Sequence, residues 1–177
     1  MPEPVRIKDI PENELTPEQA KVFKDLVAGR GRLLAPYRIW IHSPRLAAAL
    51  ETVGTFLNKK SSLTEREVEL TICIIANHWK GEYVWTVHAR TGVELGIPQS
   101  VFDIIRAGQE PVLDNERERA VYDLARIAME PGAGADELFA RAERLLGRNG
   151  IAEVLALLGY YSSVAMGVKL HRVPVRA

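Results

Sequence analysis

Apolar residues recur every three or four positions along most of the chain, which is the spacing of helices that bury one face. Thr16 and Ser43 each stand directly before a proline, an arrangement typical of helix starts. Another start lies at Thr64, where Glu67 completes a capping box. The pattern contains no strand signal and predicts helices over about 16–29, 43–57, 63–79, 82–95, 98–107, 114–130, 135–147 and 150–170.

Two of these predicted helices are too apolar for an exposed surface. The third is apolar nearly all round from Leu70 to Ala76, which predicts burial on several sides. The last, over 150–170, has too little polar face for a small monomer, so we expect it at a subunit interface.

Length and composition favour a single domain. The chain has 177 residues, 47% of them hydrophobic, which is enough for one sizeable core but marginal for two. Residues 1–15 are charged and rich in proline, and we expect them to form an extended arm. Residues 16–177 should form one all-α domain.

Charge and hydropathy exclude several kinds of partner. Lys plus Arg and Asp plus Glu both number 23, so the net charge of zero gives no electrostatic basis for binding nucleic acid or anionic lipid. The N-terminus lacks the apolar core of a signal peptide, and the most apolar stretch, 155–168, is shorter than a membrane span. These features predict a soluble, cytoplasmic protein without a membrane partner.

The cysteine and histidine content excludes most redox and metal chemistry. Cys73 is the only cysteine, so a Cys-x-x-Cys pair and a cysteine-rich zinc site cannot form within one chain. His42, His78 and His171 are isolated in sequence, and no His-x-x-x-His or Glu-x-x-His pair is present. We predict neither a metal nor a cofactor.

One pair of residues has the spacing needed for proton transfer. Glu69 lies on the same helical stripe as Cys73 and Ala76, which places a carboxylate on a face predicted to be buried. If helices 63–79 and 82–95 form an antiparallel hairpin, His88 of the second helix can meet Glu69. Trp85, three residues before His88, would then supply an apolar wall.

Structural interpretations of the same residues remain open. Glu69 can pair with Arg66 one turn earlier, and His88 can be a core histidine bound to a backbone carbonyl. Trp79, Tyr83 and Trp85 can simply be core aromatic residues.

Residues 63–97 add a resemblance to a known family. The segments that carry the resemblance are 63–70, 76–79, 82–89, Gly92 and 96–97. Together they resemble the core signature of the carboxymuconolactone decarboxylase-like family, which also contains the AhpD-like alkylhydroperoxidases. A looser likeness extends upstream through 36–38 and 42–44. The resemblance implies an orthogonal bundle of about seven or eight helices and a homo-oligomer, commonly a trimer or hexamer.

The two branches of this family imply different chemistry. The peroxidase branch carries cysteines seven and four residues before the motif histidine, where this chain has Gly81 and Val84. Because neither residue can replace a thiol nucleophile, an AhpD-type peroxidase is not expected. An antioxidant role for Cys73 with an external thiol is the least favoured alternative, since that cysteine lies in an apolar run.

Resemblance to the decarboxylase branch implies a cofactor-free lyase acting on a small carboxylated or lactone-type molecule. His88 would be the acid, with Glu69 and Glu82 setting its protonation and Trp85 as the wall. An anion clamp from Arg38 or Arg66 would hold the carboxylate, although an ion pair at a helix start is favoured for Arg66. The remaining candidates for substrate binding are Tyr83 and His42. The alternative is an oligomeric ligand-binding protein that has lost catalysis.

Overall fold

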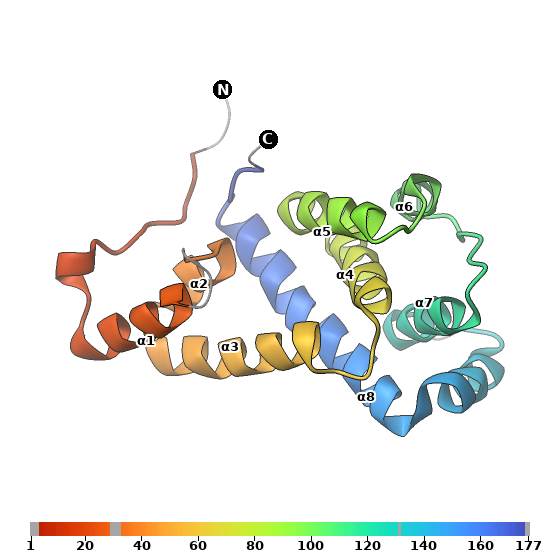
Figure 1. Ribbon diagram of the computed structural model, residues 1–177. Helices are drawn as coiled ribbons and strands as arrows, with labels where there is room; N and C mark the ends of the chain where they lie inside the picture. Colours follow the sequence, from red (N-terminus) through yellow and green to blue (C-terminus); the bar gives the residue numbers. More distant parts are fainter. Residues whose placement is uncertain (1–3, 29–32, 131, 176–177) are drawn as a thin grey trace.

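The computed structural model describes residues 4–28, 33–130 and 132–175, and the description below refers to these residues. They contain eight α-helices and no strand, so the predicted all-α class is confirmed (Figure 1). The elements are the 3-10 turn η1 (Glu12–Glu14), α1 (Pro17–Ala28), α2 (Ala35–Trp40), α3 (Pro44–Lys59), α4 (Glu65–Trp79), α5 (Glu82–Glu94), α6 (Gln99–Arg106), α7 (Glu116–Met129) and α8 (Ala135–Leu170).

Most helix boundaries match the capping signals in the sequence. Reciprocal hydrogen bonds between Thr16 and Gln19 cap α1, and a capping box of Thr64 and Glu67 caps α4. Helix α2 was not predicted, because six residues are too short for a periodic pattern. The predicted helices over 135–147 and 150–170 correspond to the two parts of α8, which meet at a kink at Gly147, whose φ of 70° is readily adopted only by glycine.

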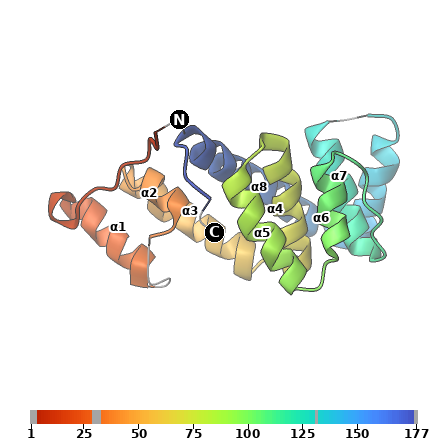
Figure 2. The same ribbon diagram turned by 90° about the horizontal axis from the view of Figure 1, so that it is seen from above.

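Helix α4 lies at the centre of the molecule. It packs against α3, α5, α6, α7 and α8, and ten of its fifteen residues are buried, which confirms the predicted all-round burial. Helix α8 also contacts α2, α3, α5 and α7. Figures 1 and 2 show α1, α2 and α3 at one end of the molecule, and α6, α7 and the first part of α8 at the other.

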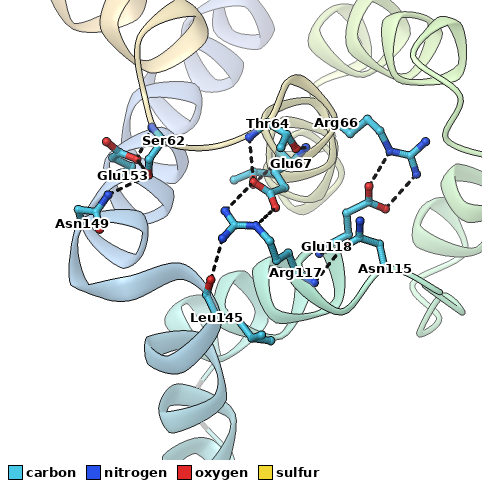
Figure 3. A network of polar contacts seen from close by, with 11 residues as sticks. Ser62, Thr64, Arg66, Glu67, Asn115, Arg117, Glu118, Leu145, Asn149 and Glu153 are labelled. Atoms are coloured by element: carbon cyan, nitrogen blue, oxygen red, sulfur yellow. Dashed lines mark hydrogen bonds and ion pairs between the residues drawn. The ribbon is translucent and has the colours of Figure 1, made fainter.

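Two crossed ion pairs join the N-terminal ends of α4 and α7 (Figure 3). The Nε atom of Arg66 lies 2.6 Å from Oε1 of Glu118, and Nε of Arg117 lies 2.8 Å from Oε1 of Glu67. Both glutamates are at most 3% exposed. The tripeptide Glu-Arg-Glu occurs twice, at 65–67 and 116–118. The repetition has a structural role, because the arginine of each copy pairs with the buried glutamate of the other.

Of the predicted N-terminal arm, residues 4–15 lie along the surface, and residues 1–3 lie outside the described part of the chain. Backbone N–H groups of Arg6 and Ile7 donate to the carbonyl of His171, at 2.9 and 3.3 Å. Asp9 forms a bidentate ion pair with Arg38 of α2. The segment from residue 4 to η1 is thus attached to both α2 and the end of α8.

Helix α8 is the only helix of the described residues that is long and apolar enough to cross a membrane by length and composition. Of its most apolar window, 44% is buried inside the protein, and core helices pass the same test. Its exposed face carries Leu155, Met166 and Leu170.

Replacing Arg117 by Ala should destabilise the fold, since the buried Glu67 carboxylate would keep the N–H of Thr64 but lose its cation. We expect urea denaturation to show a free energy of unfolding lower by about 3 kcal/mol. Arg148→Ala, which removes an exposed pair with Glu143, should change it by less than about 1 kcal/mol. Equal losses in the two variants would contradict the account.

Candidate active site at the α4–α5 hairpin

Glu69 of α4 and His88 of α5 form the polar contact that the spacing predicts. Helices α4 and α5 pack against each other, and only Lys80, which adopts the left-handed conformation, and the N-cap residue Gly81 separate them. Oε2 of Glu69 lies 2.7 Å from Nδ1 of His88. Arg66, the alternative partner of Glu69, is instead bound to Glu118.

The Glu69–His88 pair is half-buried, and it engages only one of the two ring nitrogens of His88. The side chains of Glu69 and His88 are 12% and 18% exposed, so solvent reaches the pair without surrounding it. An ionised carboxylate can only accept hydrogen bonds, so Nδ1 of His88 carries the proton that is donated to Glu69. The other ring nitrogen, Nε2, takes no part in the contact with Glu69.

Tyr161 of α8 holds the other side of the imidazole. Its ring meets that of His88 edge to face, with centroids 5.1 Å apart and an interplanar angle of 84°. The Tyr161 hydroxyl donates to Oδ1 of Asn58 on α3 at 2.9 Å. Sequence analysis assigned Tyr161 only to an apolar interface helix, and Asn58 carried no signal at all. The histidine is therefore positioned by α4, α8 and, through Tyr161, by α3.

Two further tyrosines, Tyr37 and Tyr160, form a polar contact next to Tyr161. The hydroxyls of Tyr37 and Tyr160 lie 3.2 Å apart. Burial, and then hydrogen bonding to Glu51, raises the pKa of Tyr37 well above its ordinary value, so it stays protonated. A Cβ at Gly54 would overlap the Tyr160 hydroxyl, so only glycine allows α3 to approach α8 this closely. The tyrosines thus link α2, α3 and α8 beside the histidine.

Cys73 lies one turn after Glu69 on α4 and is fully buried. Burial raises the pKa of its thiol strongly, and the neighbouring Glu69 raises it further. Because the thiolate is the reactive form, Cys73 has the environment of an inert core residue.

Two predicted site residues meet an arginine rather than the imidazole. Arg106 of α6 forms an ion pair with Glu82, and its guanidinium carbon lies 4.9 Å from the centroid of the Trp85 ring. Trp85 also packs edge to face against Phe102. Glu82 is thus engaged at the α5–α6 contact, while Trp85 lies one turn from His88 and is half-buried.

The remaining predicted residues lie elsewhere. Arg38 and Tyr83 line one cavity of about 320 Å³ outside α5. Tyr83 is five positions before His88, which places the two side chains on different faces of the helix. His42 is exposed in the turn between α2 and α3. In the described part of the chain, no group of three or more His, Cys, Asp or Glu residues could hold a metal ion.

Comparison with solved structures identifies the fold. No protein-family model matches the chain, and no curated protein sequence matches it. A peroxidase-related protein with an alkylhydroperoxidase AhpD core from Ralstonia eutropha superposes with a TM-score of 0.71 at 14% identity, covering 96% of this chain and 91% of that one. A peroxidase-related protein from Silicibacter sp. gives 0.70 at 16% identity, covering 99% and 94%.

An enzyme is also among the similar structures. The debrominase Bmp8, in complex with 2,3,4-tribromopyrrole, gives a TM-score of 0.69 at 16% identity and covers 97% of this chain and 91% of its own. The fold is therefore the AhpD-like helical fold, as the motif at 63–97 implied. Identities of 14–16% establish the fold and not the activity.

The environment of Cys73 predicts slow thiol chemistry. The raised pKa means that the thiolate fraction of Cys73 stays below that of a free cysteine at the same pH. We expect an aromatic disulfide reagent to leave the folded protein unlabelled and to label one thiol per chain in denaturant. Labelling of the folded protein at the rate of a free thiol would contradict this environment.

Proposed function

We propose that the protein is a cofactor-free acid–base enzyme, a carbon–carbon lyase of the decarboxylase type, acting on a small carboxylated or lactone-type organic molecule. The observation that carries the proposal is the 2.7 Å contact between Glu69 and His88 in a half-buried position. A carboxylate that fixes one imidazole nitrogen leaves the other poised for proton transfer near neutral pH.

The proposed reaction needs only a proton. The bond between the substrate carbon and its carboxylate breaks, carbon dioxide leaves, and the electron pair stays on the carbon as a dienolate. His88, protonated at both nitrogens, gives its Nε2 proton to that carbon, and the neutral imidazole regains a proton from water. Glu69 stabilises the imidazolium, and Tyr161 holds the ring in line.

Thiol peroxidase chemistry is not supported. The cysteine positions of the peroxidase branch hold Gly81 and Val84, and Val84 is buried. The single thiol, Cys73, is fully buried beside a carboxylate. The debrominase indicates that this fold can serve an enzyme whose bound molecule is a small ring compound.

We further propose a cytoplasmic homo-oligomer, a trimer or hexamer, with α8 at the interface. Its exposed Leu155, Met166 and Leu170 are apolar surface that a second copy would cover. Val53 and Phe56 on α3 are further exposed apolar side chains that a second copy would cover. No nucleic acid or membrane partner is proposed, in keeping with the zero net charge.

A second candidate function is a ligand-binding protein that has lost catalysis. One observation favours it: three cavities found among the described residues are lined by side chains other than Glu69 and His88. The two functions differ in whether any substrate turns over.

The test is a screen of carboxylated lactones for release of carbon dioxide, followed by variants on any active compound. His88→Gln should lower kcat by a factor of at least about 100, because the proton donor is lost. Glu69→Gln should lower kcat less, since the His88 imidazole, the proton donor, remains. His78→Gln, which removes an exposed histidine of α4, is the matched control and should be as active as the wild type. Full activity of His88→Gln, with fold and oligomer intact, would refute the assignment.

A further inference from the structure

The cavity outside α5 has the lining of a site for an organic anion. It measures about 320 Å³ and lies between α5, the start of α2 and residues 173–175. Its polar lining consists of Arg38, Tyr83, Thr86 and Arg90, while residues 33–35, Val87 and residues 173–175 make the rest apolar. Two guanidinium groups, a phenol and a hydroxyl therefore border an otherwise apolar space.

Arg38 already binds a carboxylate in the way that a ligand would. Nε and Nη2 of Arg38 lie 2.5 and 2.9 Å from the two oxygens of Asp9, a bidentate geometry that matches guanidinium to carboxylate. The side chain of Asp9 is 66% exposed and comes from the N-terminal segment, whereas that of Arg38 is 22% exposed. Because the Asp9 side chain is mostly exposed and lines the neighbouring cavity, Arg38 can exchange it for a ligand carboxylate while Asp9 returns to water.

Arg90 supplies a second cation with a weak partner. Its Nε lies 3.8 Å from Glu94, and both side chains are more than two-thirds exposed. A neighbouring cavity of about 470 Å³ shares Arg38 but is also lined by Asp9 and Glu12, whose charges would repel an anion. Charge therefore selects the smaller cavity for an anionic ligand.

We propose that this cavity binds a small organic monocarboxylate, with the carboxylate on Arg38 and Arg90 and the apolar body between residues 33–35 and 173–175. Binding displaces Asp9 from Arg38. The ligand class is an aromatic or branched aliphatic acid, because the lining of the cavity combines two cations with a mostly apolar remainder.

The site is separate from the Glu69–His88 pair. Tyr83, Thr86, Val87 and Arg90 recur at helical spacing and share the outer face of α5, while His88 points to Glu69 on the inner face. A helix with its side chains is roughly 10 Å across, so a ligand in the cavity does not reach His88 of the same chain. The proposal thus adds a binding site and does not depend on the proposed catalysis.

Isothermal titration with benzoate tests the proposal, with benzyl alcohol as the uncharged control. Asp9→Asn should bind benzoate about fivefold more tightly than the wild type, because the competing carboxylate is gone. Arg90→Gln should bind about tenfold more weakly, and Arg38→Gln should bind weaker still. His88→Gln should bind like the wild type, and benzyl alcohol should not bind.

Three outcomes would overturn the proposal. One is the absence of benzoate binding to both the wild type and Asp9→Asn at millimolar concentration. Another is benzoate binding that survives both arginine substitutions in proteins whose circular dichroism is native. The third is binding lost in His88→Gln but kept in Arg90→Gln, which would place the anion at the catalytic pair and support the proposed function instead.

Discussion

The crossed ion pairs between α4 and α7 are the constraint on which the rest of the structure depends. Glu67 and Glu118 are buried carboxylates, and a buried carboxylate without a cation costs several kcal/mol. Because each acid takes its arginine from the opposite helix, the two helix starts can dock in only one register. This register fixes the position of α4, against which α3, α5 and α8 pack. It also determines that Glu69, two residues after Glu67, faces α5.

The candidate active site follows from that placement through a short series of contacts. Glu69 orients His88, the ring of Tyr161 closes the other side of the imidazole, and Asn58 holds the Tyr161 hydroxyl. Four helices therefore set the position of one ring, which is the rigidity that a proton-transfer site requires. The same packing buries Cys73 beside Glu69, and both the burial and the nearby carboxylate disfavour thiol chemistry.

Local signals made much of the fold predictable, and long-range packing explains what they missed. Capping residues marked the starts of α1, α3 and α4 in the sequence. The helical spacing within the two helices of the hairpin predicted the contact between Glu69 and His88. Helix α2 escaped because its six residues are held by tertiary contacts of Tyr37 and Trp40 rather than by a local pattern. The roles of Tyr161 and Asn58 could not be predicted, since the two residues are 103 positions apart. Arg38 and Tyr83 lie around one cavity on the outer face of α5, a placement that their positions in the sequence do not reveal.

The central claim is that Glu69 and His88 move a proton to or from a carbon atom, and hydrogen–deuterium exchange measures this directly. In heavy water, NMR follows the replacement by deuterium of the proton on the carbon next to the carbonyl of an unsaturated lactone. The lactone does not have to be decarboxylated for this exchange to be observed. The account predicts exchange catalysed by the wild-type protein that falls to the background rate in His88→Gln and is reduced in Glu69→Ala. Background exchange with the wild type, or equal catalysis by His88→Gln, would contradict it.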